Sequence, residues 1–262
     1  MTTPLLELDG VTKRFGRVVI AEDLSLAVGP GDTVGIVGPN GAGKTSLFGL
    51  ISGDLAPNAG EVRFAGRTVT KLDPAARCRL GIGRTYQVPR PFGDMTVFEN
   101  LLVAAQQGGG LRRRASYVAA AAALDRTGMT GQANVQAERL GLLQRKRLEL
   151  ARALATQPTL LLLDEVAGGL TDPEVAQLVE IVRGVNAEGT AVIWIEHVVR
   201  ALTAAVRRLI CLTGGKFVGD GDPAAVLATP AVREVFLGGD VTAALTGGTL
   251  EAPVPGGERG EP

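Results

Sequence analysis

Short apolar runs alternate with longer amphipathic stretches along much of the chain. The runs TVGIVG at 33–38, LLLLDE at 160–165 and AVIWIE at 191–196 have the length and composition of buried strands. Helical periodicity follows two of them, in SLFGLISG at 46–53 and in EVAQLVEIVRGVNAEG at 174–189. Because helices that join buried strands build parallel sheets, the pattern predicts an α/β fold with a mostly parallel core sheet.

Three other parts of the chain have different patterns. LLELDGVTKRF and VVIAEDLSLAV, near the N-terminus, predict antiparallel strands of an N-terminal β subdomain. Residues 88–140 are rich in Ala, Gln and Arg and lack strand signals, which predicts a small helical subdomain. Residues 238–262 form a C-terminal tail whose Gly/Pro-rich end has few apolar residues, so we expect this end to be disordered.

Composition supports a globular protein in a reducing compartment. The 262 residues are 45% hydrophobic, enough for a sizeable core. Lys+Arg and Asp+Glu both number 27, so no bulk charge attracts nucleic acid, and we expect no nucleic-acid partner. Cys78 and Cys211 are far apart and are predicted to be unpaired, which favours a cytoplasmic location. No apolar run approaches the ~20 residues that a membrane-spanning helix needs.

The segment GPNGAGKT at 38–45 lies between a predicted strand and a predicted helix. Its glycines let successive backbone N–H groups point inward, and the helix N-terminus adds partial positive charge. Lys44 would reach the β- and γ-phosphates and Thr45 would bind Mg²⁺. The alternative, a glycine-rich turn that binds nothing, does not explain the strand and helix on either side. The predicted nucleotide-binding residues here are Gly38, Pro39, Asn40, Gly41, Ala42, Gly43, Lys44, Thr45 and Ser46.

Two carboxylates end the buried strand LLLLDE. Asp164 is expected beside the phosphates, where it would help to hold Mg²⁺. Glu165, one residue further, is expected to orient and deprotonate the water that attacks the γ-phosphate. The alternative is a helix N-terminus that simply favours acidic residues, but the phosphate loop about 120 residues upstream supports the catalytic interpretation.

In this order and spacing, GPNGAGKT, GIGRTYQ, ARALATQPTLLLLDE and WIEH resemble the nucleotide-binding subunit of an ATP-binding-cassette (ABC) transporter, over about residues 4–237. The longer stretch GIGRTYQVPRPFGDMTVFENLLVA resembles the ATPase subunits of branched-chain amino acid importers, the group that serves hydrophobic amino acids, amides and urea. The resemblance implies a P-loop NTPase of the ABC type that hydrolyses ATP with Mg²⁺ to power import. The alternatives are a regulatory or structural nucleotide-binding subunit with low turnover, and a soluble relative acting on DNA or ribosomes.

The resemblance also assigns roles to three further residues. Gln87 matches the Q-loop glutamine, which binds Mg²⁺ and the attacking water, and His197 matches the switch histidine that contacts the γ-phosphate. Phe15 matches the aromatic residue that stacks on adenine. Without the family, these would be read as a polar loop residue, a structural histidine and a core phenylalanine.

The signature segment differs from the family pattern. The usual Leu-Ser-Gly-Gly-Gln stands here as LGLLQ at 140–144. In the family this segment closes on the γ-phosphate held by the opposite subunit, so Gly141 and Gln144 are expected to contact nucleotide. Leu142 and Leu143 add bulk, and losing the serine hydroxyl removes a hydrogen bond of ~1.5–3 kcal/mol. The sequence therefore predicts a weakened signature.

Two segments near this motif carry further signals. RKRLELARALA predicts a helix with Leu148, Ala151, Leu154 and Ala155 on its apolar face. An ordinary amphipathic helix without any contact to a partner is the alternative. In GGLTD, Thr171 stands where many family members have an aspartate that contacts the partner subunit.

The resemblance implies several partners. These are transmembrane permease subunits, a second ATPase subunit and a periplasmic or extracellular solute-binding protein, with this chain peripheral to the cytoplasmic face of the cell membrane. Because the phosphate loop, Asp164, Glu165 and His197 follow the family pattern and the signature does not, we prefer a heterodimer in which the partner's signature completes this chain's site. A homodimer is the second hypothesis.

Overall fold

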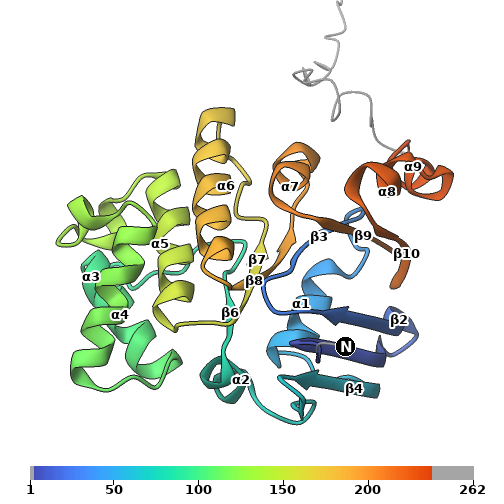
Figure 1. The fold of residues 1–262 in the computed structure, drawn as a ribbon, viewed down its shortest axis with the longest axis horizontal. Helices are drawn as coiled ribbons and strands as arrows, with labels where there is room; N and C mark the ends of the chain where they lie inside the picture. The colour runs from blue at the N-terminus through green and yellow to red at the C-terminus, as the bar shows by residue number, and fades with distance from the viewer. Residues whose placement is uncertain (1–2, 238–262) are drawn as a thin grey trace, which may run out of the picture.

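The computed structural model describes residues 3–237 and is built on a six-stranded sheet (Figure 1). The strand order is β10-β9-β3-β8-β7-β6, and neighbours pair in parallel except for β10, which is antiparallel to β9. The predicted mostly parallel core sheet is thus confirmed. Its strands are β3 (Thr33–Val37), β6 (Ile82–Arg84), β7 (Leu160–Asp164), β8 (Ala191–Ile195), β9 (Arg208–Thr213) and β10 (Lys216–Gly221).

A second, antiparallel sheet has the order β2-β1-β4-β5. Helix α1 (Lys44–Ser52) shares one apolar core with this sheet and with one face of the six-stranded sheet. The antiparallel N-terminal strands are therefore as expected. The strands are β1 (Leu6–Phe15), β2 (Val18–Val28), β4 (Ala59–Phe64) and β5 (Arg67–Thr68).

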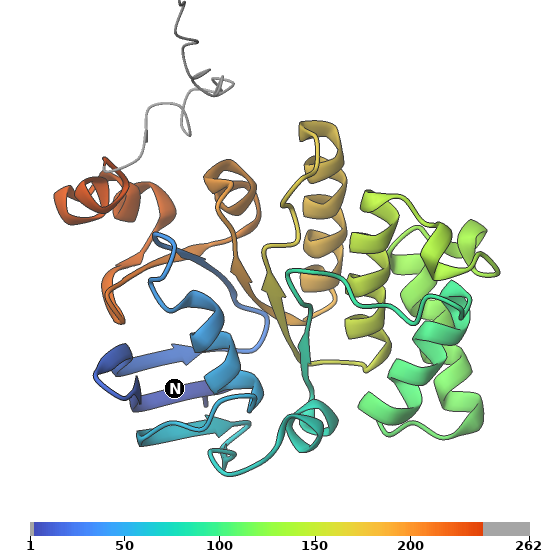
Figure 2. The same cartoon turned by 180° about the vertical axis from the view of Figure 1, so that it is seen from behind.

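Helices cover the other face of the core sheet and extend beyond the β6 edge. Helices α6 (Asp172–Ala187) and α7 (Val199–Ala205) pack on that face, and the segment from α3 to α5 stands to one side of the sheet in both views (Figure 2). That segment contains α3 (Val97–Val103), the π-helical turn η1 (Ala104–Gly108), α4 (Arg113–Arg126), the short 3₁₀ turns η2 (Thr130–Gln132) and η3 (Ala137–Arg139), and α5 (Leu142–Ala155). The remaining helices are α2 (Pro74–Leu80), α8 (Pro223–Ala228) and α9 (Pro230–Leu237).

Element ends differ from the sequence prediction by a few residues. Helix α1 begins at Lys44 rather than 46 because Gly43, at φ 102°, ends the loop directly before it. Helix α6 begins at Asp172 because Thr171 and Glu174 form a reciprocal capping box. The C-terminal tail at 238–262 lies outside the described residues.

Two further features concern location and redox state. Cys78 and Cys211 are both free thiols, as expected. Among residues 3–237, no helix is long and apolar enough to cross a membrane.

Candidate functional site

Most of the predicted site residues lie at the ends of four neighbouring strands of the core sheet. The phosphate loop follows β3, Gln87 follows β6, Asp164 and Glu165 end β7, and His197 follows β8. Since these strands are parallel and lie in the order β3-β8-β7-β6, their carboxyl ends meet at one edge of the sheet. The fold therefore brings together residues that are up to 160 positions apart in the chain.

The phosphate loop requires glycine at two of its positions. A Cβ on Gly38 would lie 2.0 Å from the Leu212 carbonyl oxygen, and one on Gly43 would lie 2.4 Å from that of Ile20. Gly43 also has a left-handed φ of 102° at the cap of α1. Between them Pro39, Asn40 and Gly41 are exposed. The loop thus keeps its curled path and leaves its outer residues open to a ligand.

Lys44 lies almost buried at the start of α1. Its Nζ donates to the carbonyls of Gly38 at 2.7 Å and Pro39 at 3.0 Å. Burial lowers the pKa of Lys44, whereas the nearby carboxylates of Glu165 and Asp164 act to raise it. The ammonium therefore lies inside the loop, where its hydrogen-bond partners are two neutral carbonyls. The negative oxygens of a bound phosphate would be its counter-ions.

Glu165 leaves β7 in an unusual backbone conformation. Its φ is +48°, a region that non-glycine residues rarely occupy, and its N–H donates to the Ile195 carbonyl at 2.9 Å. Strain of this kind is found at functional sites where the surrounding structure holds it in place. The turn separates the two carboxylates, so that Asp164 stays buried in the strand and Glu165 projects from its end.

The Glu165 carboxylate is held from both sides. His197 Nε2 lies 2.6 Å from Oε1, and Gln87 Nε2 donates to Oε2 at 2.5 Å. The Glu165 side chain is 14% exposed and that of His197 is 44% exposed. The two partners fix the carboxylate near the surface, where a water or a phosphate can reach it.

Asp164 is buried, and only one of its two carboxylate oxygens accepts a hydrogen bond within residues 3–237. Arg84 donates to its Oδ2 at 3.2 Å, and its Oδ1 is buried with no hydrogen-bond partner among the described residues. A carboxylate oxygen without a donor fits a cation, and Thr45 is exposed at the start of α1. This arrangement fits the residues that would hold Mg²⁺: Thr45, Gln87 and Asp164.

Comparison with known proteins agrees with this geometry. A family model for ABC transporters matches residues 21–168. The chain belongs to the ABC transporter ATPase family. It is 35% identical to the high-affinity branched-chain amino acid transport ATP-binding protein LivG of Salmonella typhimurium, over 91% of this chain and 99% of the relative. It is 34% identical to BraF of Pseudomonas aeruginosa over the same shares, a protein described in the same words.

Solved structures of ABC cassettes have the same fold. A nucleotide-free ATP-binding cassette from an ABC transporter has a TM-score of 0.83 at 27% identity and covers 89% of this chain and 99% of its own. The ADP conformation of MJ1267, an ATP-binding cassette of an ABC transporter, also has a TM-score of 0.83, at 28% identity, covering 91% of this chain and all of its own. The predicted ABC-type P-loop fold is therefore confirmed, and the chain is an ATPase that binds nucleotide.

The signature of this ABC ATPase lies at the N-terminus of α5. Gly141 caps the helix in an extended conformation, and no side chain within residues 3–237 caps its first turn with a hydrogen bond. Leu142 is 48% exposed and Leu143 packs partly against the core. The first-turn N–H groups thus remain available to an anion, as the family role requires, but an apolar side chain stands beside them.

Two other predicted binding residues lie at the end of β1 and in the first turn of α5. Phe15 ends β1 and is 54% exposed, with Lys13 Nζ 5.0 Å from the centre of its ring. It is therefore not a core residue, and its ring is accessible for stacking. Gln144 is half-buried in the first turn of α5.

Two buried charges on α5 were missed by the sequence analysis. The apolar face of α5 is buried as predicted, but Lys146 and Glu149 are only 5% and 4% exposed. Lys146 Nζ donates to the backbone carbonyls of Gln87 at 3.0 Å and Glu165 at 3.2 Å. Helical periodicity predicts only the apolar face of this helix, because it contains no information about loops that pack on the opposite face.

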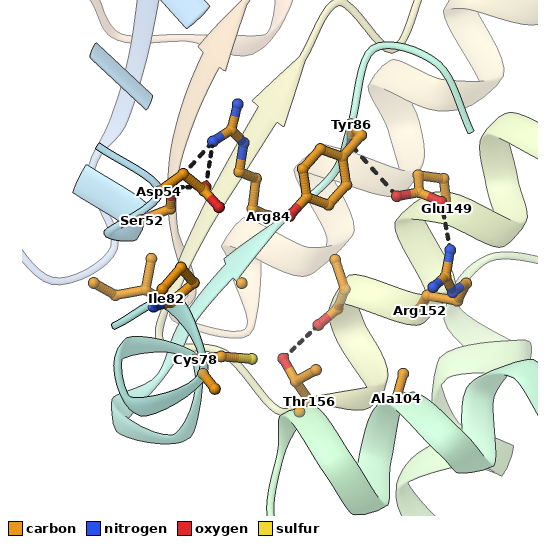
Figure 3. A pocket seen from close by; sticks show the side chains of 15 residues that line it. Ser52, Asp54, Cys78, Ile82, Arg84, Tyr86, Ala104, Glu149, Arg152 and Thr156 are labelled. Atoms are coloured by element: carbon orange, nitrogen blue, oxygen red, sulfur yellow. Dashed lines mark hydrogen bonds and ion pairs between the residues drawn. The ribbon is translucent and has the colours of Figure 1, made fainter. Parts of the chain in front are cut away.

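A pocket of about 280 Å³ lies between the core sheet and the helical segment from α3 to α5, and Tyr86 is one of its lining residues (Figure 3). Arg84 and Asp54 line its core side, and Glu149 and Arg152 of α5 line the other. Glu149 accepts hydrogen bonds from the Tyr86 N–H at 3.4 Å and from Arg152 at 2.9 Å. Both walls are therefore charged, and the loop that carries Gln87 is tied to α5.

Proposed function

We propose that this chain is the ATP-hydrolysing subunit of an importer for branched-chain amino acids or related small polar solutes. The observation that carries the proposal is the Glu165 carboxylate, held between His197 and Gln87 beside the phosphate loop. Its substrate class rests on the names of the LivG and BraF relatives. We place the chain on the cytoplasmic face of the cell membrane, as a peripheral subunit.

The site residues divide the chemistry among themselves. Backbone N–H groups between residues 38 and 46, except at Pro39, and the Lys44 ammonium would bind the phosphates, and Phe15 would stack on adenine. Thr45, Gln87 and Asp164 would hold Mg²⁺, which neutralises phosphate charge when bound. Glu165 would orient the attacking water and accept its proton, while His197 fixes Glu165 and contacts the γ-phosphate.

The loop that carries Gln87 is the proposed contact with the transmembrane permease subunits. Tyr86, Val88, Phe92 and Met95 are all exposed apolar or aromatic side chains within ten residues. A cluster of this kind next to a pocket is typical of a protein contact surface. Because Gln87 is bound to Glu165, movement of this loop by a permease segment would move a catalytic group.

The altered signature supports a proposal for the subunit composition. Leu142 stands exposed beside the first turn of α5, where the family's serine and glycines would approach a partner's phosphate. We therefore propose a heterodimer in which a second ATPase subunit supplies an intact signature to this chain's nucleotide. A homodimer is the alternative, and a periplasmic or extracellular solute-binding protein would complete the importer.

The proposal is tested in membrane vesicles that contain the assembled transporter. We expect ATP-dependent uptake of radiolabelled leucine, and we expect Glu165→Gln to lower ATP turnover at least 100-fold with ATP affinity unchanged. A matched control is Glu180→Gln, on the exposed face of α6, which should retain full turnover. Unchanged turnover in Glu165→Gln would refute the catalytic role, and uptake of a different solute class would refute the substrate.

A further inference from the structure

Arg84 lies between the pocket and the strand that carries Asp164. It ends β6, and its side chain is only 9% exposed beside Asp54 and Ser52 (Figure 3). Its guanidinium carbon lies 5.8 Å from the ring centre of Phe48 and 5.2 Å from that of Tyr86. Aromatic faces attract a guanidinium and limit its movement. Arg84 is therefore a cation fixed in place, although neither the loop motif nor the family resemblance gives it a role.

The two ends of the guanidinium bind different carboxylates. One terminal nitrogen donates to Asp54 Oδ2 at 2.8 Å and to Ser52 Oγ at 3.0 Å, both on the pocket wall. The other donates to Asp164 Oδ2 at 3.2 Å. Because a guanidinium is planar and rigid, displacing one end displaces the other.

This contact decides which Asp164 oxygen is free. Within residues 3–237, Arg84 is the only side chain that donates to the Asp164 carboxylate, and it takes Oδ2. Oδ1 is left buried and without a donor. A carboxylate held by one oxygen presents the other in a fixed direction, which is how a neighbouring group tunes a metal ligand.

We propose that Arg84 is a positioning residue that keeps Asp164 Oδ1 free for Mg²⁺ and links this carboxylate to Asp54 on the pocket wall. The proposal rests on the Mg²⁺ site proposed above. The proposal predicts that loss of Arg84 weakens Mg²⁺ binding, even though Arg84 is itself a cation. The Asp164 side chain would lose the one donor that it has in the described part of the chain, and with it its fixed orientation. The proposal also makes the metal site respond to changes at Asp54.

Nucleotide affinity with and without the metal tests the role of Arg84. The dissociation constant of a fluorescent ADP is measured for the purified chain in excess Mg²⁺ and in EDTA. We expect Arg84→Gln to weaken binding about tenfold in Mg²⁺, equivalent to about 1.4 kcal/mol, and less than twofold in EDTA. Arg84→Lys, which retains the charge, should recover part of the loss. A loss of equal size in EDTA would show a merely structural role and overturn the proposal.

The link to the pocket is tested with Asp54→Asn. In the native background this variant should weaken Mg²⁺-dependent ADP binding about threefold, because the guanidinium loses its outer anchor. In the Arg84→Gln background it should have no further effect, since coupled residues are not additive. Additive effects of the two substitutions would overturn the link.

Two comparisons separate this inference from the proposed function. Arg208→Gln removes an arginine that binds both oxygens of Asp220, away from the nucleotide edge, and should change neither dissociation constant. If Mg²⁺ does not tighten ADP binding by the unmodified chain, the proposed metal site is wrong and the inference falls with it. If Mg²⁺ tightens binding equally in the unmodified chain and in Arg84→Gln, the metal site stands and only the inference is overturned.

Discussion

At the scale of one residue, the buried carboxylate of Asp164 lowers the stability of the fold. Its carboxylate is 1% exposed, and its Oδ1 has no partner among the described residues. Burial raises the pKa of Asp164, and the charge and hydrogen bond of Arg84 only partly offset this effect. A buried carboxylate of this kind opposes folding at neutral pH, and the proposed Mg²⁺ site gives a reason for its presence.

The first prediction concerns the pH dependence of stability in Asp164→Asn. The pKa of Asp164 is higher in the folded chain than its value of about 4 in the unfolded chain, so the unfolded chain loses this proton at lower pH. The free energy of unfolding therefore falls as pH rises from about 4 through the folded-state pKa. We expect Asp164→Asn to raise the free energy of unfolding by about 1 kcal/mol at pH 8 and by less at pH 5. Urea unfolding in EDTA without nucleotide measures both values. A decrease at pH 8 would show that the ion pair with Arg84 outweighs the cost of burial.

At the scale of elements, the sequence predicts the strands and the loop that depend on a local pattern of residues. The strands at 33–38, 160–165 and 191–196 were found because buried parallel strands are short, continuous apolar runs. The phosphate loop was found because its glycines are required by local backbone geometry. The roles of Arg84 and Lys146 could not be predicted, since both bind groups that are distant in sequence and reach them only through the pairing of β6 with β7 and the packing of α5.

The second prediction concerns the contact between α5 and the catalytic loops. Lys146 joins the signature helix to the backbones of Gln87 and Glu165, and Lys146→Met keeps most of its bulk but removes the donor. We expect the turnover number to fall about tenfold, a change of about 1.4 kcal/mol in the barrier, with nucleotide affinity in EDTA unchanged. Steady-state ATPase assays on the assembled transporter measure the first quantity.

The control for this variant is its neighbour. Arg145 is exposed and donates only to the Glu138 carbonyl within the helical segment, at 2.8 Å. Arg145→Met should therefore leave the turnover number unchanged. An equal loss in both variants would mean that the effect comes from the helix itself and not from the contact with the loops.

At the scale of the whole molecule, the two halves of the ATPase site differ in completeness. The phosphate loop, Glu165 and His197 are assembled at one edge of the core sheet, whereas the signature at the start of α5 carries Leu142 and Leu143. On the proposal made above, the chain would hold ATP in its own site, whereas Leu142 and Leu143 would hinder its closure on the ATP of a second copy. This difference favours pairing with a different ATPase subunit.

The last prediction tests that pairing in the Glu165→Gln background, which should trap any dimer closed around ATP before hydrolysis. With Mg-ATP, we expect light scattering to show a monomer for the native LGLLQ signature. Replacing Gly141→Ser, Leu142→Gly and Leu143→Gly together should produce an ATP-dependent dimer, because the close approach of backbone N–H groups to phosphate is restored. The added glycines should cost stability, about 1 kcal/mol each in a helix, so a thermal unfolding measurement accompanies the scattering. If the native signature forms a dimer with Mg-ATP, the result supports the homodimer. Native mass spectrometry of the transporter provides a second test, because two copies of this chain and no other ATPase would exclude the heterodimer.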